Sequence, residues 1–144
     1  MKIVNKKAHF DYLVIDKFEA GVVLTGAETK SLYLGQATLD EAYIRDINGE
    51  LFLLNAHIHP YQFAQTDKTD PKRTRKLLLN KKEILAIIGK LKQGNLAVIP
   101  LSWYNKGRKI KLEIALAKGK KAWEKREAIK KRDINRDVEQ SLAL

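Results

Sequence analysis

Residues 70–83 have the sequence DPKRTRKLLLNKKE, and they contain a turn, a block of charge, an aliphatic run and a helix start in direct succession. The Asp-Pro pair predicts the turn, because the residue before a proline is kept out of the helical region. Three leucines follow the cations and predict a short segment of the core. Asn80, with Glu83 three positions later, predicts a helix N-cap with a capping box. The cations of this stretch are therefore expected to lie between a turn and a core segment that fix their positions.

Positive charge is concentrated around the same stretch. The 144 residues include 28 Lys and Arg against 17 Asp and Glu, a net charge of +11, and residues 71–111 alone contain twelve of the cations and one Glu. Clustered cations are typical of nucleic-acid binding, because phosphate contacts release counterions. The alternatives are a solvated basic surface and a face for anionic lipid. The second is weakened because no strongly apolar helix face lies beneath the charge.

Composition limits the class of protein. With 44% apolar residues, the chain is long enough for one domain with a core. It contains no cysteine, which excludes disulfides, thiolate catalysis and cysteine-based zinc sites. The N-terminus lacks an apolar signal region and no stretch approaches the length of a membrane span. We therefore expect a cytoplasmic protein with no membrane partner.

Strands are indicated by β-branched and aromatic runs, by period-2 alternation and by turn dipeptides. The predicted strands cover residues 9–24, 38–46, 50–59, 96–104 and 108–117. The first strand is expected to bend at Gly21, and Asn48-Gly49 predicts a hairpin turn. Pro100 predicts an edge or bulge position in its strand.

Two helices are predicted between these strands. Residues 27–34 form a short helix stopped by Gly35, and the helix that starts at Asn80 has an aliphatic stripe at helical spacing. The stripe consists of Ile84, Ile87, Ile88 and Leu91. A mainly β chain with a helix before its last pair of strands predicts a small closed β-barrel of the OB type. An open α+β sheet is the alternative.

The character of the chain changes after residue 117. Residues 118–144 favour a helix but have few apolar positions, so we expect residues 1–117 to form the domain and residues 118–144 a basic tail. Isolated helices of this length are marginal in water, which predicts a tail that is disordered when free and helical when bound to something anionic. A helix packed loosely on the barrel is the alternative.

Enzymatic function is not indicated. The chain has three serines, no phosphate-binding loop and no dinucleotide-binding glycine motif. His57 and His59 would share one face of a strand, but no third ligand lies at a diagnostic spacing, so we interpret them as structural or surface residues. We therefore expect no catalysis, no metal and no cofactor.

Glu19 and the aromatic residues are the remaining candidates for binding. Glu19 precedes the bend at Gly21, where its carboxylate would either accept hydrogen bonds from a base edge or pair with a cation such as Lys111. Tyr43, Tyr61, Trp103, Tyr104 and Trp123 are interleaved with basic segments. Bases stack on such rings for about 1–3 kcal/mol each. Trp123 stands apart because it lies in the apolar-poor tail, where core packing does not explain it.

Four segments, in this order, carry a resemblance to a known family. They are FEAG at residues 18–21, ETKSL at 28–32, DP and RTRKLLL at 70–79, and AKGKK at 117–121. With this order and spacing, the chain resembles the SsrA-binding protein family, or small protein B, the tmRNA-binding proteins of trans-translation. The match runs over nearly the whole chain.

The resemblance implies an RNA-binding adaptor rather than an enzyme. It implies an OB-type barrel that binds the tRNA-like domain of tmRNA, and a tail that enters the decoding centre and empty mRNA channel of a stalled ribosome. Delivery would occur as alanyl-tmRNA with elongation factor Tu, and we expect a monomer. A general OB-fold RNA-binding protein or a structural ribosomal protein is the alternative.

The resemblance also implies which residues make these contacts. The family's RNA-contact positions correspond to Glu19, Leu78 and Lys111. Further RNA-binding candidates are Tyr12, Lys30, Tyr43, Arg73, Arg75, Lys76 and Asn80. The ribosome-binding tail would comprise Gly119, Lys120, Lys121, Trp123, Glu124, Lys125, Arg126, Lys130, Lys131 and Arg132.

Two positions depart from the family pattern. Glu124 stands where the family usually has aspartate, which keeps the charge but lengthens the side chain. Phe10 stands where the family often has histidine, so a polar RNA contact cannot be carried over to it, although stacking can.

Overall fold

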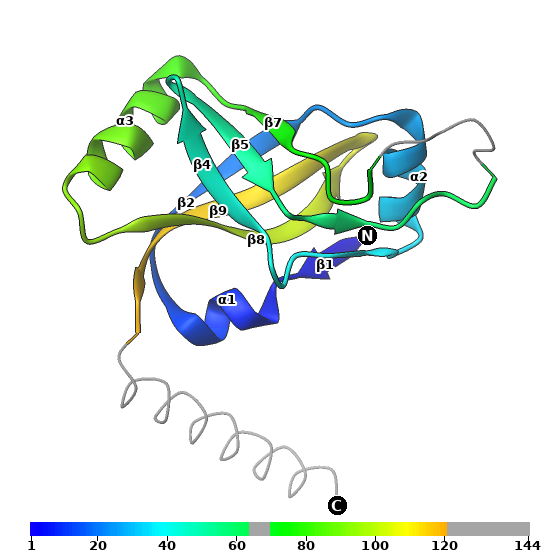
Figure 1. Ribbon diagram of the computed structural model, residues 1–144, viewed down its shortest axis with the longest axis horizontal. Coiled ribbons are helices and arrows are strands. Elements are labelled where there is room, and N and C mark those ends of the chain that lie inside the picture. The colour runs from blue at the N-terminus through cyan, green and yellow to red at the C-terminus, as the bar shows by residue number, and fades with distance from the viewer. Residues whose placement is uncertain (64–69, 121–144) are drawn as a thin grey trace, which may run out of the picture.

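The computed structural model describes residues 1–63 and 70–120 (Figure 1). Its elements in chain order are β1 Lys2–Val4, α1 Lys6–Asp11, β2 Tyr12–Val22, α2 Gly26–Tyr33, β3 Ala37–Thr38, β4 Tyr43–Ile47, β5 Glu50–Leu54, β6 His57–Ile58, β7 Arg75–Leu78, α3 Lys81–Lys92, β8 Ala97–Lys106 and β9 Lys109–Gly119. Seven strands form one antiparallel sheet in the order β1-β8-β9-β2-β7-β5-β4, and β3 pairs with β6 separately. The prediction of a mainly β fold is confirmed.

The sheet is strongly bent. The hairpin β4–β5 crosses in front of β8 and β9, and β4 lies in contact with β8 (Figure 1). Within residues 1–63 and 70–120, no strand pairing joins the two edge strands β1 and β4. The pairing therefore describes an open sheet that folds over itself, and it does not confirm the predicted closed barrel.

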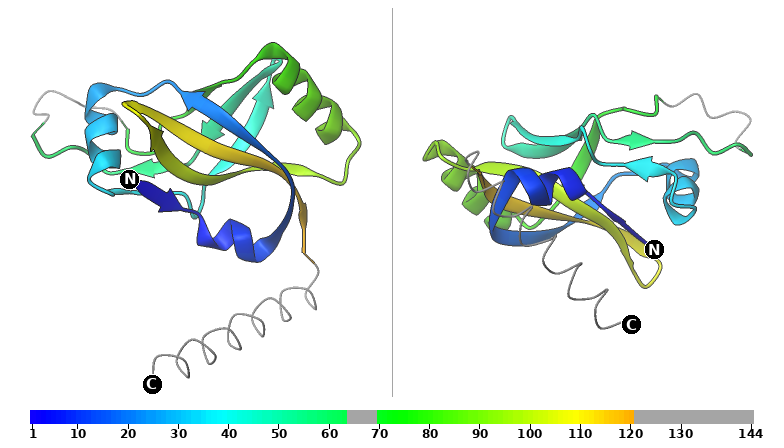
Figure 2. Two further views of the ribbon diagram at one scale, coloured as in Figure 1. Left: turned by 180° about the vertical axis from the view of Figure 1, so that it is seen from behind. Right: turned by 90° about the horizontal axis from the view of Figure 1, so that it is seen from below.

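The core lies inside this bend. Trp103 of β8, Leu112 and Ile114 of β9 and Leu77 of β7 have no more than 1% of their surface exposed. The two longer helices lie at opposite ends of the sheet, α3 at one end and α2 at the other, as both views in Figure 2 show. Ile87, the innermost residue of the predicted aliphatic stripe, anchors α3 to this core.

Several local predictions are confirmed by the backbone. The hairpin between β4 and β5 turns at Asn48 and Gly49, with φ angles of 54° and 81°. Helix α2 is followed by Gly35 at φ 73°. Both turns need positive φ, which asparagine and glycine tolerate better than other residues. Pro100 lies at a register shift between β8 and β9, so the predicted bulge is present, but β8 is an interior strand rather than an edge.

Other local predictions are wrong. The strand predicted from residue 9 begins at Tyr12, because Asn5 caps a short helix, α1, by accepting a hydrogen bond from the Ala8 N–H. The irregularity in β2 lies between Val14 and Asp16 instead of at Gly21. The strand predicted over residues 38–46 is divided into β3 and β4. These strand boundaries and the irregularity depend on local side-chain hydrogen bonds and on sheet register. The apolar pattern of the sequence does not encode either of them.

The predicted capping box of α3 is also absent. Asn80 occupies the N-cap position of α3, but its side chain makes no capping hydrogen bond. A complete capping box forms instead at α2, where Thr25 accepts from the Glu28 N–H and Glu28 accepts from the Thr25 N–H. Glu28 is thereby held at the start of α2, close to the basic stretch.

The last described residues extend β9 beyond the predicted domain boundary at residue 117. Lys118 and Gly119 pair with Leu13 and Tyr12, and the Lys120 N–H donates to the Asp11 carbonyl at 2.8 Å. The remainder of the predicted tail, residues 121–144, lies outside the described residues, so its order stays a prediction. No helix in the described part of the chain is long and apolar enough to cross a membrane.

Candidate nucleic-acid interface

One row of residues crosses four neighbouring strands on the outer face of the sheet. Leu78 of β7 is paired with Gly21 of β2, Gly21 with Lys111 of β9, and Lys111 with Tyr104 of β8. Residues directly opposite one another in antiparallel strands point to the same face. An apolar side chain, a bare glycine, a cation and a tyrosine therefore follow one another across this face.

A groove lies over Gly21. It is lined by Glu19, Gly21, Leu78, Leu79, Asn80, Glu83 and Lys111. A Cβ atom at Gly21 would lie 3.3 Å from the Leu78 Cβ, so the missing side chain leaves room for the close approach of β7. The three residues that the resemblance names as RNA contacts, Glu19, Leu78 and Lys111, come from three strands and line this one groove.

Leu78 is an exposed leucine among charged neighbours. Strand β7 alternates, with Arg75 and Leu77 pointing inward and Lys76 and Leu78 pointing outward. Leu78 is consequently 51% exposed, although the run of three leucines suggests a core segment. An exposed apolar side chain beside cations suits contact with the face of a base or ribose, while the cations meet phosphate.

Glu19 is held by Tyr104 and Lys106. Its Oε2 accepts a hydrogen bond from the Tyr104 hydroxyl at 2.5 Å, and its Oε1 lies 3.7 Å from the Lys106 Nζ. The Tyr104 hydrogen bond and the nearby charges of Lys106 and Lys111 lower the pKa of Glu19, so it is ionised at neutral pH. Its ion-pair partner is Lys106 rather than the predicted Lys111, and the proposed contact to a base edge stays a prediction.

Arg75 is not available to RNA, which corrects its prediction as an RNA contact. It has no exposed surface. Its guanidinium donates to Glu28 Oε2 and to the Ala56 carbonyl, both at 2.7 Å, and to the Pro71 carbonyl at 3.1 Å. A basic side chain in a charged run is usually solvated, but β7 alternation turns this one into the core, where Glu28 supplies the opposite charge.

Arg73 shares the same carboxylate. Its Nη2 donates to Glu28 Oε1 at 2.6 Å and to the Val23 carbonyl at 3.0 Å, and its side chain is 27% exposed. Burial opposes ionisation of Glu28, but hydrogen bonds from Arg73, the Thr25 N–H and Arg75 outweigh it and hold the pKa of Glu28 below its usual value. Burial lowers the pKa of Arg75, and Glu28 partly offsets this. The contacts of Arg73 and Arg75 with Glu28 therefore attach the start of β7 to α2.

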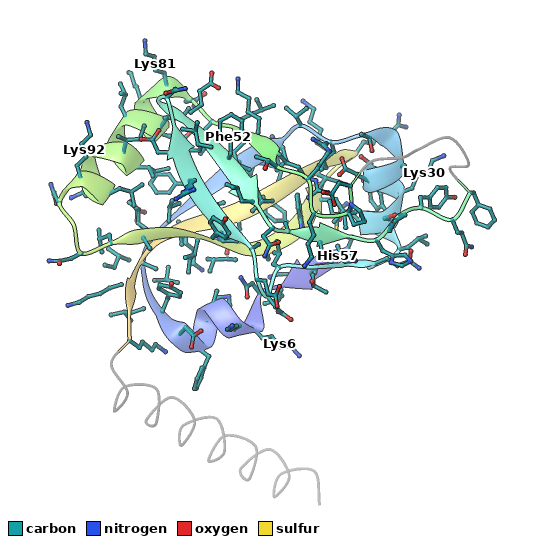
Figure 3. All side chains as sticks on the ribbon, in the orientation of Figure 1. Lys6, Lys30, Phe52, His57, Lys81 and Lys92 are labelled. Carbon is teal, nitrogen blue, oxygen red and sulfur yellow. The ribbon has the colours of Figure 1, made fainter. Side chains whose placement is uncertain are left out.

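Apart from Asn80, the remaining candidates do not line the groove over Gly21. Lys76 pairs with Glu50 at 3.2 Å, and Lys30 lies 5.3 Å from the ring centre of Tyr61. Figure 3 shows Lys30 on α2 at the far end of the molecule from Lys81 and Lys92 of α3.

Tyr12 and Tyr43 line a second groove with Asp11, Asp40 and Glu41. Asn80 does line the groove over Gly21. Of the predicted tail residues, Gly119 ends β9 and Lys120 contacts α1, and the others lie outside the described residues.

The contacts of two residues in this region were not predicted from the sequence. Glu28 has a visible signal, because Thr25 followed three positions later by Glu28 is a capping-box pattern that marks the residue as fixed. Tyr104 has no comparable signal, because its contact with Glu19 depends on the order of β2, β9 and β8. Trp103, considered as a stacking residue, is fully buried in the core.

No group of metal ligands forms in the part of the chain that the structure describes. His57 and His59 have ring centres 6.2 Å apart and lie at the short strand β6 and just after it. The interpretation of these two residues as surface or structural residues stays a prediction.

Comparisons with known proteins find relatives that match most of this chain. The SsrA-binding protein of Sulfurihydrogenibium sp. (strain YO3AOP1) is 50% identical over 137 residues, covering 95% of this chain and 90% of that protein. The SsrA-binding protein of Geotalea uraniireducens is 49% identical over 134 residues, covering 93% and 89%.

A solved structure described as "tmRNA-SmpB: a journey to the center of the bacterial ribosome" is also similar. It has a TM-score of 0.70 and 39% sequence identity and covers 84% of this chain and 85% of that one. The family model for the SmpB protein matches residues 2–143, almost the entire sequence. The chain therefore belongs to the SmpB protein family.

Proposed function

We propose that this protein is an RNA-binding adaptor of trans-translation, which binds the tRNA-like domain of tmRNA and brings it to stalled ribosomes. The relatives are named for SsrA binding, and the similar solved structure is described as tmRNA with SmpB at the bacterial ribosome. Family membership over residues 2–143 supports the same role here. The protein acts by binding, without catalysis, and a role on ribosomes places it in the cytoplasm.

The observation that carries this proposal is the meeting of Glu19, Leu78 and Lys111 in one groove. They lie far apart in the sequence, and each supplies a different element of RNA recognition. Lys111 meets a phosphate, Leu78 packs on a base or ribose, and Glu19 accepts hydrogen bonds from a base edge. Sequence-specific RNA recognition depends on such combinations at unpaired bases, whereas cations alone bind any RNA.

We further infer that the bent sheet has the shape of an OB-type barrel. We also infer that the residues after Lys120 form a separate ribosome-binding tail. The contact between β4 and β8 supports the first inference, because it brings the two halves of the sheet together. The basic composition of residues 118–144 supports the second. The tail enters the small-subunit decoding centre and empty mRNA channel, and the protein arrives as a monomer with alanyl-tmRNA and elongation factor Tu.

Binding to a transcript of the tRNA-like domain of tmRNA tests the groove. Lys111→Ala should weaken binding, and the salt slope of log Kd should become shallower by about 0.7–0.9, because one phosphate contact is lost. The melting temperature should stay unchanged, since the Lys111 side chain points out of the sheet. Filter binding at several salt concentrations gives Kd and its salt slope, and thermal unfolding gives the melting temperature.

An unrelated structured RNA of equal length is the matched control. The adaptor should bind it at least tenfold more weakly than the tRNA-like domain at physiological salt. Equal affinity for both RNAs would instead favour a general OB-fold RNA-binding protein, and unchanged affinity of Lys111→Ala would exclude the groove as the contact.

Truncation after Lys120 tests the division between domain and tail. This end point keeps Lys118 and Gly119, which are paired in β9, so the domain should fold with an unchanged melting temperature. Binding of the tRNA-like domain should be retained, and peptide tagging on ribosomes stalled in a reconstituted translation system should be lost. Loss of RNA binding together with tagging, in a truncated protein that still folds, would contradict the division.

A further inference from the structure

The hydrogen bond between Tyr104 and Glu19 joins two strands that are not neighbours. Strand β9 lies between β2 and β8, with Glu19 paired to Glu113 and Tyr104 paired to Lys111. The two side chains meet above β9, where the Tyr104 hydroxyl donates to Glu19 Oε2. This contact fixes the position of the Glu19 carboxylate relative to β8 and β9.

The two oxygens of Glu19 differ in how they are occupied. Oε2 accepts from the hydroxyl of Tyr104, a half-buried residue, whereas the only partner of Oε1 among residues 1–63 and 70–120 is the Lys106 ammonium at 3.7 Å. The Lys106 side chain is 73% exposed, and such ion pairs contribute little and exchange readily with other partners. Burial and the hydrogen bond to Glu19 raise the pKa of Tyr104, so the hydroxyl stays protonated and remains a donor at neutral pH.

Without Tyr104, the Glu19 carboxylate would be free to rotate toward other cations. Lys106 and Lys111 both lower its pKa through their charge, and Lys111 lines the same groove. An ion pair between Glu19 and Lys111 would remove both side chains from RNA contact. The carboxylate would no longer accept from a base edge, and the paired ammonium would bind phosphate less well. The hydroxyl of Tyr104 holds the carboxylate on its own side of the groove and leaves Lys111 to the phosphate.

We propose that Tyr104 is a positioning residue for RNA recognition, whose hydroxyl orients Glu19 so that the carboxylate accepts hydrogen bonds from N–H donors on a base edge, as guanine presents them. The inference rests on the proposed function, because it requires RNA in the groove. A carboxylate offers about four acceptor positions on its two oxygens, so the bond from Tyr104 leaves enough free for a base edge. Bound RNA displaces Lys106 from Oε1 and leaves the bond to Tyr104 intact.

A double-variant cycle tests the proposal with a transcript of the tRNA-like domain of tmRNA as the probe. Tyr104→Phe removes only the hydroxyl and should raise Kd about tenfold, because the Glu19 carboxylate then pairs with nearby lysines and must be reoriented before it accepts from a base edge. Glu19→Gln should raise Kd at least as much. In the Glu19→Gln variant the Tyr104 hydroxyl has no carboxylate to orient, so adding Tyr104→Phe should leave Kd at the value of Glu19→Gln alone.

The control variant is Tyr33→Phe. The Tyr33 hydroxyl donates to the Arg108 carbonyl at 3.4 Å, outside the groove, and its removal should leave Kd unchanged. An unchanged Kd for Tyr104→Phe, or losses that multiply in the double variant, would overturn the proposal while leaving tmRNA binding by the wild type intact. Failure of the wild type to prefer the tRNA-like domain would overturn the proposed function, and this inference with it.

Discussion

Replacing Leu78 with aspartate is expected to raise the Kd for the tRNA-like domain of tmRNA about 100-fold, or about 2.7 kcal/mol. Leu78 is 51% exposed in the groove beside Glu19, so the change removes an apolar contact with RNA and adds a further negative charge that repels phosphate. The fold should be unaffected, because the side chain points out of the sheet. Filter binding and thermal unfolding measure the two effects.

Two control variants separate the groove from general surface effects. Leu85→Asp introduces the same charge at a leucine of α3 that is 59% exposed and does not line the groove, and it should change Kd less than threefold. Lys76→Ala removes one cation that pairs with Glu50 and should also cost less than Leu78→Asp. A larger loss for Lys76→Ala would show that charge, rather than the groove, determines recognition.

The sequence predicted the parts of the fold that depend on local chemistry. Asn48-Gly49 placed the hairpin correctly, because the turn needs residues that tolerate positive φ. The aliphatic stripe around Ile87 placed α3, and the alternation predicted over residues 108–117 placed β9. Each signal is contained within about ten residues, so no tertiary information is needed to interpret it.

The sequence predicted less well the parts that depend on neighbours in the sheet. Charge alone selected Arg75 as an RNA contact, but β7 alternation buries it against Glu28, 47 residues earlier in the chain. Asparagine is a residue type that favours the N-cap position, yet the Asn80 side chain makes no capping hydrogen bond. The pairing of Tyr104 with Glu19 crosses 85 residues and an intervening strand. The resemblance to a family supplied Glu19, Leu78 and Lys111, and the strand order explains why those three residues line one groove.

Replacing Glu28 with alanine is expected to lower the free energy of unfolding by about 3–5 kcal/mol, because it leaves the buried Arg75 without its opposite charge. The change also removes the capping box of α2 and the carboxylate that holds Arg73. A loss of this size is a large part of the stability of a small domain. Urea unfolding, followed by tryptophan fluorescence from the buried Trp103, measures it.

A matched exposed ion pair and a conservative variant complete this test. Glu50→Ala breaks the exposed pair with Lys76 and should cost less than about 1 kcal/mol. Glu28→Gln keeps the shape of the side chain and removes its charge, so its stability can be measured even if the alanine variant does not fold.

The pH dependence of stability tests the charge of Glu28. Because the pKa of Glu28 is lower in the folded state than its usual 4.5, its contribution to the free energy of unfolding is present at neutral pH and is lost as the pH falls below that value. The wild type should therefore lose stability in acid more steeply than Glu28→Gln, and equal slopes would show that Glu28 does not hold Arg73 and Arg75 as an ionised carboxylate.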